Sequence, residues 1–244
     1  GLAGDALTTG GSNIVVGVSA LGADTKGSKS VAVGRSALQD QNFTTATDTH
    51  NVAVGFEAGK RISTGVKNVL LGGLAGDALT DADKNIAIGY LALSADTLGS
   101  KSIAVGNAAL GSQNFSTATD SYNVAIGDEA GTSVTTGVQN LIVGGLAGDA
   151  LTSGTHNTAL GTIALTGDTQ GNFSVAVGYG TLATQNFTTS TNSHNVAVGY
   201  SAGNDVTTGL RNVIIGSLAG DALTDADDNV AVGQGALGSD TLGS

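Results

Sequence analysis

Residues 51–59 read Asn-Val-Ala-Val-Gly-Phe-Glu-Ala-Gly, and versions of this stretch recur along the whole sequence. Each copy opens with Asn or Ser, continues with three residues that are almost all apolar, and reaches a Gly. Three residues after that Gly comes an Ala, except in one copy where Thr181 takes its place. The thirteen copies have their glycines at Gly17, Gly34, Gly55, Gly72, Gly89, Gly106, Gly127, Gly144, Gly161, Gly178, Gly199, Gly216 and Gly233.

The spacing of the copies adds a second level of repetition. Successive units are 17, 21, 17 and 17 residues long, and this quartet occurs three times, as super-repeats 13–84, 85–156 and 157–228. Residues 1–12 look like a partial coil and 229–244 like a partial super-repeat. Such regular periods are typical of solenoids. We therefore predict a single repeat domain over 1–244, and expect it to be a fragment of a longer fibre.

Within one unit the local chemistry predicts an extended segment followed by a turn. β-branched residues favour strands, and alternation places Val52 and Val54 on one face and Ala53 on the other. Gly55 suits a turn because Gly tolerates a positive φ. The leading Asn suits a turn as well, and we expect a second short strand around Ala58. The sequence predicts an all-β, parallel β-solenoid of about fourteen flattened, two-sided coils, without helix, because no 3.6-residue apolar period is present.

Composition narrows the classes of protein and of site. The 244 residues include 39 Gly but no Pro, Cys, Met or Trp, and the apolar residues are mostly small, which suits a narrow interior. Without Cys there is neither a disulfide nor a thiolate metal site. The net charge of −11 argues against nucleic-acid binding. No apolar run is long enough to span a membrane, so we expect no membrane insertion of this segment.

Few residues suggest chemistry. His50, His156 and His194 each precede a unit start, where an exposed turn residue is a simpler interpretation than a catalytic one. The acidic residues that recur at the 72-residue period are interpreted as turn residues as well: Asp5, Asp77, Asp149 and Asp221, and Asp24, Asp96, Asp168 and Asp240. We expect no catalytic residue, no cofactor and no enzyme activity.

Calcium is an alternative at two acidic turns, 81–83 and 225–228, which offer oxygen ligands. The equivalent turn, 153–155, reads Ser-Gly-Thr and has no carboxylate. The prediction is therefore solvated turns and no metal.

The four extra residues of each 21-residue unit form Thr-rich segments that begin at Phe43, Phe115 and Phe187. One interpretation is a longer turn whose Phe packs on a neighbouring coil or chain. The other is a protruding loop that contacts a receptor or glycan. We favour packing. An ice-binding array is disfavoured because the Thr-rich segment occurs only once in four coils.

The middle residue of each three-residue segment leads to a prediction about assembly. If the first and third residues point into the coil, the middle one points outward. It is usually Ala, but the fourth unit of each quartet has Leu70, Ile142 or Ile214. Strands that are apolar on both faces are buried on both faces. We therefore expect these three residues at a contact between chains, in a homo-oligomer.

The motif Asn-Val-Ala-Val-Gly-x-x-Ala, at 51–58 and 195–202, resembles the head repeat of trimeric autotransporter adhesins and the repeats of phage tail-fibre proteins. The resemblance covers essentially the whole chain and implies a left-handed parallel β-roll, three chains side by side and attachment to surfaces. The resulting hypothesis is the structural shaft of a trimeric, extracellular fibre, on a virion tail or a bacterial surface, that holds a tip for a host receptor or glycan. The alternative is a solenoid that itself binds glycan or ice along one face.

Overall fold

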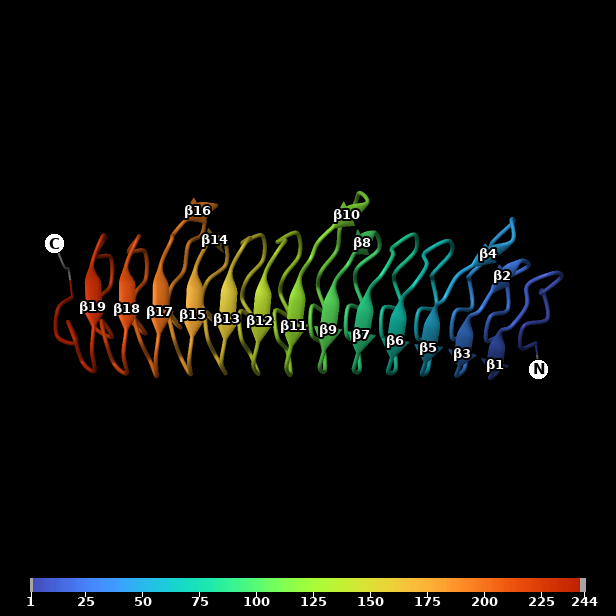
Figure 1. Cartoon of the computed structure of the whole chain (residues 1–244), viewed down its shortest axis with the longest axis horizontal. Helices are drawn as coiled ribbons and strands as arrows, with labels where there is room; N and C mark the ends of the chain where they lie inside the picture. The colour runs from blue at the N-terminus through green and yellow to red at the C-terminus, as the bar shows by residue number, and fades with distance from the viewer. Residues whose placement is uncertain (1, 242–244) are drawn as a thin grey trace. The chain divides into compact units, whose positions relative to one another are not determined.

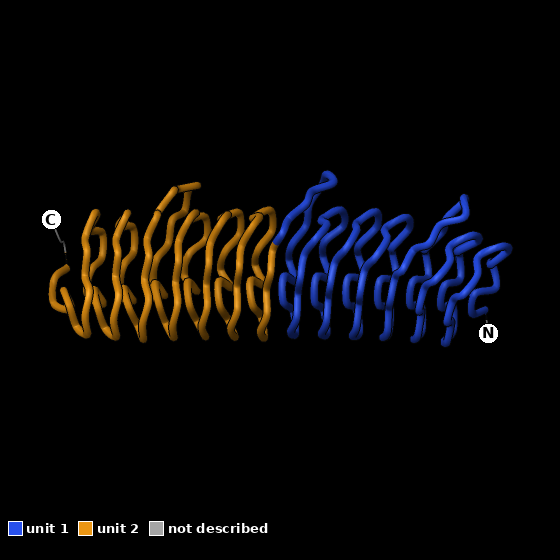
Figure 2. Tube along the Cα trace, viewed as in Figure 1, with its two compact units in different colours: residues 1–122 blue, residues 123–244 orange. Residues whose placement is uncertain are grey.

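The computed structural model describes residues 2–241 as a parallel β-solenoid, and no helix occurs in that range (Figure 1). The chain divides into two compact units, residues 1–122 and 123–244 (Figure 2). Each unit is a stack of coils, and each complete coil contributes one strand of three residues. The two units together have thirteen such strands, which confirms the predicted fold class.

In unit 1, six of these strands form a parallel sheet in the order β1, β3, β5, β6, β7, β9. Their bounds are β1 (Ile14–Val16), β3 (Val31–Val33), β5 (Val52–Val54), β6 (Val69–Leu71), β7 (Ile86–Ile88) and β9 (Ile103–Val105). Two further pairs of two-residue strands are parallel as well: β2 (Gly27–Ser28) with β4 (Thr47–Asp48), and β8 (Gly99–Ser100) with β10 (Thr119–Asp120).

In unit 2, seven strands pair in the order β11, β12, β13, β15, β17, β18, β19. Their bounds are β11 (Val124–Ile126), β12 (Leu141–Val143), β13 (Thr158–Leu160), β15 (Val175–Val177), β17 (Val196–Val198), β18 (Val213–Ile215) and β19 (Val230–Val232). One two-residue pair, β14 (Gly171–Asn172) with β16 (Thr191–Asn192), completes the unit.

The predicted second strand around Ala58 is absent. Residues 56–61 form a turn instead, because Glu57 and Gly59 both have left-handed φ angles, of 56° and 58°. A chain that alternates into the left-handed region in this way cannot continue as a strand. Within residues 2–241, additional strands occur only as two-residue pairs, each between a 21-residue coil and the 17-residue coil before it.

The predicted alternation is present, but its direction was wrong. The middle residue of each strand points into the coil, and the first and third point outward: Ala53 and Leu70 have no exposed surface, whereas Val54 is 38% exposed. Leu70, Ile142 and Ile214, predicted to lie between chains, are therefore fully buried within one chain. The reason is the limited space inside the coil. The middle strand residue is Ala in most coils and a larger residue, Leu or Ile, in one coil of each quartet.

The rest of the interior is filled from the turn that follows each strand. The Ala three residues after the turn Gly is buried, as at Ala58 and Ala130. The next buried side chain is either a Leu directly after it, such as Leu38, or a residue four positions after it, such as Ile62. Each coil thus contributes a few small or medium side chains, and these are enough to fill the interior of a coil this narrow.

The turn glycines have the predicted positive φ, which ranges from 125° to 144°. Most of them, from Gly17 to Gly216, also face the equivalent glycine of the next coil. A Cβ on Gly144 would lie 2.5 Å from the carbonyl oxygen of Gly161, far closer than real atoms approach. Both the backbone conformation and the spacing between coils therefore require glycine at this position.

We predict that Gly144→Ala lowers the free energy of unfolding by at least about 3 kcal/mol, because strain at positive φ and displacement of the next coil add together. The adjacent Gly145→Ala is the matched control. Its φ is not in the positive region, and a Cβ there meets only the carbonyl oxygen of Asp128, at 4.0 Å. Denaturant unfolding followed by circular dichroism measures both; equal stability of the two variants would contradict this account of the turn.

Candidate functional site

The residue that opens each unit forms a buried ladder along the coils. Asn51 has no exposed surface, and its Nδ2 donates to the carbonyl of Gly65 (2.8 Å), at the end of its own coil. Its Oδ1 accepts the backbone N–H of Asn68 (2.9 Å), which opens the next coil. The Asn residues were predicted to be local turn residues. They instead connect one coil to the next and pair buried backbone groups that water cannot reach.

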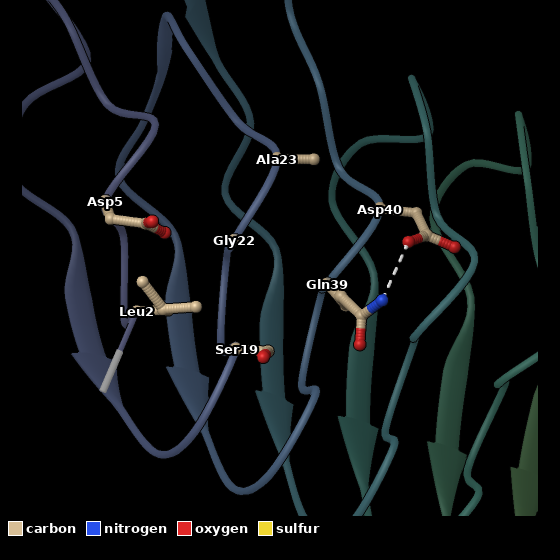
Figure 3. A pocket seen from close by; sticks show the side chains of 7 residues that line it. All are labelled: Leu2, Asp5, Ser19, Gly22, Ala23, Gln39 and Asp40. Carbon is tan, nitrogen blue, oxygen red and sulfur yellow. Dashed lines mark hydrogen bonds between the residues drawn. The ribbon is translucent and has the colours of Figure 1, made fainter.

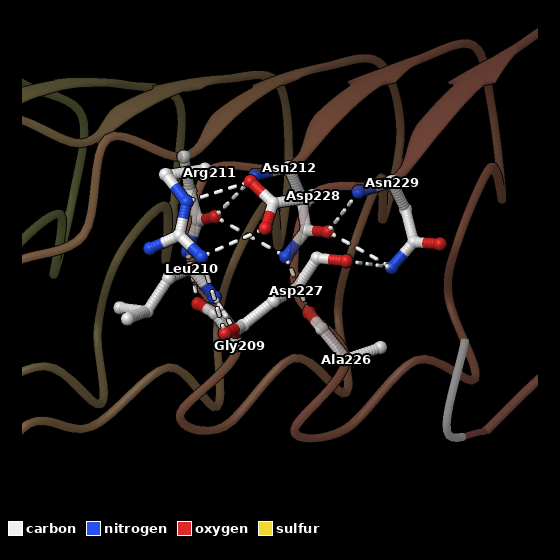
Figure 4. A network of polar contacts seen from close by, with 9 residues as sticks. Gly209, Leu210, Arg211, Asn212, Ala226, Asp227, Asp228 and Asn229 are labelled. Carbon is white, nitrogen blue, oxygen red and sulfur yellow. Dashed lines mark hydrogen bonds and ion pairs between the residues drawn. The ribbon is translucent and has the colours of Figure 1, made fainter. Parts of the chain in front are cut away.

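The same ladder continues in unit 2, where Figure 4 shows its last described steps. Asn212 donates to the carbonyl of Ala226 (2.7 Å) and accepts the N–H of Asn229 (3.0 Å). Beside it, the guanidinium of Arg211 forms ion pairs with Asp227 and Asp228 of the following coil. These acidic residues therefore also act as links between coils.

Three coils open with Ser instead of Asn, and each of them is a 21-residue coil. In the first, Gln41 extends its side chain into the interior and replaces the missing amide. Its Nε2 donates to Asp24 Oδ2 (2.6 Å) and to Ser30 Oγ (3.0 Å), and its Oε1 accepts Nδ2 of Asn51 (2.8 Å). Thr49 Oγ1 lies 2.5 Å from Ser30 Oγ. The ladder thus passes through the longer coil without an unpaired amide.

Unit 2 contains the equivalent network around Asp168. Its Oδ2 accepts Nε2 of Gln185 (2.6 Å), and its Oδ1 accepts the N–H groups of Gly171 (3.0 Å) and Phe187 (3.1 Å). Burial raises the pKa of Asp168, and these hydrogen bonds oppose the rise only in part. Burial raises the pKa of Asp96 in unit 1 for the same reason. Both residues were interpreted as turn residues, and each does accept the backbone N–H three residues on, but both are also fully buried and bond to the following coil.

The outer face of the strands is apolar and uncovered within one chain. All but one of the first and third strand residues are Val, Ile or Leu; the exception is Thr158. Several are exposed large side chains, such as Ile88 in unit 1 and Ile126 and Ile215 in unit 2. Parallel sheets occur almost only where both faces are covered. This face, defined as the first and third residues of the three-residue strands, is called the outer face below.

No acidic residue lies on the outer face. We define the leading edge as the residue before each opening Asn or Ser, and the trailing edge as the residue after each turn Gly. Of the 20 acidic residues in the sequence, only Asp128 and Asp228 lie in these two edges, and none lies on the outer face. Absence of charged residues from the core of an apolar patch is typical of protein interfaces.

The two edges also hold cationic and aromatic side chains. At the leading edge, Phe173 stacks between His156 and His194, with ring centroids 4.8 and 5.2 Å away. At the trailing edge, Tyr179 and Tyr200 stack with centroids 5.6 Å apart. All three histidines are exposed, as predicted. Stacking along the coils holds these rings in fixed rows.

The insertion loops are anchored by their Phe residues. Phe43, Phe115 and Phe187 are 6–7% exposed, so the packing interpretation is confirmed for all three rings. The ring of Phe115 lies against Gly99, where an added Cβ would meet it at 2.7 Å. Residues 44–46, 116–118 and 188–190 are exposed, and the loops project from the coils near β4, β10 and β16 (Figure 1).

A shallow surface pocket lies in unit 1 between successive coils (Figure 3). Its lining includes the carboxylates of Asp5 and Asp40, and Gln39 Nε2 donates to Asp40 Oδ1 (3.3 Å). The other lining residues are Leu2, Ser19, Gly22 and Ala23.

The acidic turns proposed as calcium ligands bond to the preceding coil instead. Asp81 Oδ1 accepts the hydroxyl of Thr64 (2.6 Å), and Asp83 Oδ1 accepts the N–H of Val66 (2.8 Å). Among residues 2–241, no three His, Cys, Asp or Glu side chains gather as a metal site would require. Their hydrogen bonds to the preceding coil account for the positions of Asp81 and Asp83.

Comparison with family models, with curated proteins and with solved structures gives no match for this chain. Over the described part of the chain, no helix has the length and apolar character needed to cross a membrane.

We predict that Asn140→Ala lowers the free energy of unfolding by about 2–5 kcal/mol, because it leaves two buried groups unpaired. These are the carbonyl of Gly154 and the N–H of Asn157. The control is Gln139→Ala at the adjacent exposed residue, which should change stability by less than about 0.5 kcal/mol. If the two variants unfold at the same denaturant concentration, the ladder is not a main source of stability.

The pH dependence of stability tests the buried carboxyl. Because the pKa of Asp168 is higher in the folded chain than in the unfolded one, its ionisation costs stability. The contribution of Asp168 to folding stability should therefore increase as the pH falls through the raised pKa and decrease as the pH rises. Asp168→Asn cannot titrate, so wild type should gain stability relative to this variant as the pH falls from neutral toward the ordinary Asp pKa of about 3.9. Asp205→Asn, at an exposed position, is the control. If wild type instead loses stability relative to Asp168→Asn as the pH falls, the hydrogen bonds lower the pKa of Asp168 by more than burial raises it.

Proposed function

We propose that this chain is the shaft of a homotrimeric, extracellular attachment fibre, on a virion tail or a bacterial cell surface, that carries a tip for a host receptor or glycan. The observation that carries the proposal is the outer face: an apolar, parallel sheet surface that nothing in the single chain covers. Two further features support it, the absence of carboxylates from this face and the repetition of one coil throughout both units.

In this proposal the contact between chains is made by the first and third strand residues, not by the middle residues that the sequence predicted. Leu70, Ile142 and Ile214 fill the coil, whereas the first and third strand residues are free to meet another copy. Full burial of such a side chain contributes about 1.5–3 kcal/mol, and each here is partly buried already, so the gain per residue is smaller. Repetition over thirteen strands still gives a stable association. The number of chains, three, comes from the resemblance to trimeric fibres.

The threonine hydroxyl groups that bond one coil to the next favour a shaft over an ice- or glycan-binding face. Thr80 Oγ1 donates to the carbonyl of Thr97 (3.0 Å), and Thr152 Oγ1 donates to that of Thr169 (2.9 Å). These hydroxyl groups are already used between coils. They are therefore not a free array for a ligand.

The experiment is light scattering on wild type and on Ile126→Asp combined with Ile215→Asp. Both side chains are 40% exposed, so the single chain should tolerate the change, while a charge in a chain–chain contact is costly. We expect a trimeric wild type and a dissociated double variant. Thr136→Asp is the control, since the equivalent positions are already Asp81 and Asp225 and lie off the outer face. A monomeric wild type, or a double variant of unchanged mass and Tm, would overturn the proposal.

A further inference from the structure

Each 21-residue coil contains a short motif that the scaffold does not explain. The motif reads Asn-Phe-Thr or Asn-Phe-Ser and lies at 42–44, 114–116 and 186–188. Asn-x-Thr and Asn-x-Ser, where x is not Pro, are the acceptor motifs of N-linked glycosylation. A fourth copy, 172–174, spans the boundary between two coils. The motif also arises by chance in a chain rich in Ser and Thr, so the structure decides which copies an enzyme can reach.

The asparagines of the three motifs in the 21-residue coils are exposed, although their backbone is held in the coil. The N–H of Asn42 donates to the carbonyl of Ser63 (2.9 Å), and that of Asn186 donates to the carbonyl of Thr207 (2.9 Å). The Phe that follows each asparagine is the buried anchor of the insertion loop, which projects from the coil directly after it (Figure 1). Each asparagine thus lies at the base of a projecting loop, on a backbone of fixed position.

The amide nitrogens of these asparagines are available for chemistry. The oxygen is the atom that the scaffold contacts: Oδ1 of Asn114 accepts the hydroxyl of Thr97 (3.0 Å), and Oδ1 of Asn186 accepts that of Thr169 (3.0 Å). Among the hydrogen bonds of residues 2–241, none is donated by Nδ2 of the three asparagines. The hydroxyl groups that complete the motifs are exposed and equally unused, at Thr44, Ser116 and Thr188.

The asparagine is not required for bonding one coil to the next. Most coils have Thr or Ser at this position, and its hydroxyl donates to the following coil, as Thr80 Oγ1 does to the carbonyl of Thr97 (3.0 Å). The side chain of Asn42 makes no such bond. It accepts the hydroxyl of Thr25 (3.3 Å), but that hydroxyl has a single proton and lies closer to the carbonyl of Phe43 (2.9 Å). A role in the scaffold therefore does not account for the amide.

The fourth copy of the motif has the opposite environment. Asn172 is 5% exposed, and its Nδ2 donates to Ser190 Oγ (3.1 Å). Ser174, which completes this motif, is fully buried, and its Oγ accepts Nε2 of Gln185 (2.8 Å). The folded chain therefore presents neither the amide nor the hydroxyl of this copy, which makes it an internal control.

We propose that Asn42, Asn114 and Asn186 are acceptor sites for N-linked glycosylation of the folded chain, and that Asn172 is not. The co-substrate is a sugar activated as a diphosphate ester. Nδ2 forms a bond to the anomeric carbon of the sugar, and the bond from that carbon to the phosphate oxygen breaks. The diphosphate leaves with the electron pair, and the amide proton passes to a base of the transferase.

This inference rests on one part of the proposed function, the extracellular location, because N-linked sugars are typical of surface loops in secreted proteins. None of the three asparagines belongs to the outer face, which consists of strand residues alone. The modification and the proposed contact between chains therefore use different surfaces.

The test is transfer of glucose to the purified chain by a soluble asparagine glycosyltransferase with UDP-glucose, followed by mass spectrometry of the peptides. The chain is produced in a host that lacks N-glycosylation. We expect one hexose at each of Asn42, Asn114 and Asn186 and none at Asn172. After denaturation and tryptic cleavage, Asn172 should accept hexose as well, because burial no longer protects it.

Two results would overturn the proposal. One is a folded chain that accepts no hexose at the three sites although the denatured digest does. The other is equal occupancy of Asn172 in the folded chain, because the structure would then not determine which copies are modified.

Variants of the third residue test whether the motif itself is recognised. Thr44→Ala should lose the hexose at Asn42 alone, and the matched control Thr44→Ser should keep it, because either hydroxyl completes the motif. Thr44 is exposed, and circular dichroism checks that both variants fold. Thr188→Ala repeats the test at Asn186 in unit 2. Unchanged transfer to both alanine variants would show that the motif is not the acceptor.

The outcomes separate this inference from the proposed function. If light scattering gives an oligomer but the folded chain accepts no hexose, the acceptor sites are wrong and the self-assembly stands. If light scattering gives a monomer whose three asparagines are modified, the proposed shaft fails and the acceptor sites stand.

Discussion

The buried asparagine ladder is the interaction on which the rest of this structure depends. A coil with so few side chains inside cannot stabilise itself by apolar burial alone, and its backbone would enter the interior with unpaired groups. Asn51 solves both problems, since one amide closes its own coil at Gly65 and holds the next at Asn68. Where Ser30 replaces the amide, Gln41 and Asp24 restore the connection at the cost of a buried carboxyl.

The ladder also explains why the interior is filled in the way observed. With Asn at the start of the coil and the turn Gly fixed by the approach of the next coil, the apolar residues that face inward are the middle strand residue, the following Ala, and one residue either directly after that Ala or four positions after it. The first and third strand residues, mostly Val and Ile, must then point outward. An apolar exterior is thus a consequence of a small interior, and it makes a single chain incomplete as a parallel sheet structure.

The repeat, the turn glycines and the all-β class could be predicted from the sequence because each is a local pattern with one physical meaning. The direction of alternation could not, because Val-Ala-Val permits either face to be the inner one, and volume inside the coil decides between them. Asp24 looked like any turn carboxylate. The signal for its burial was its recurrence in the coil before each 21-residue coil, 17 residues ahead of a Gln equivalent to Gln41, a pattern that only the three-dimensional network interprets.

The 21-residue coils show how the sequence of such a chain can change during evolution. Val31 pairs with Val52 across 21 residues in the same register in which Val52 pairs with Val69 across 17. The extra residues leave the stack as a loop, and the coils above and below keep their positions. Length can therefore be added at these points without disturbing the scaffold. The loops are ready-made sites for displaying new sequence at regular intervals, so surface properties can diversify while the framework stays constant.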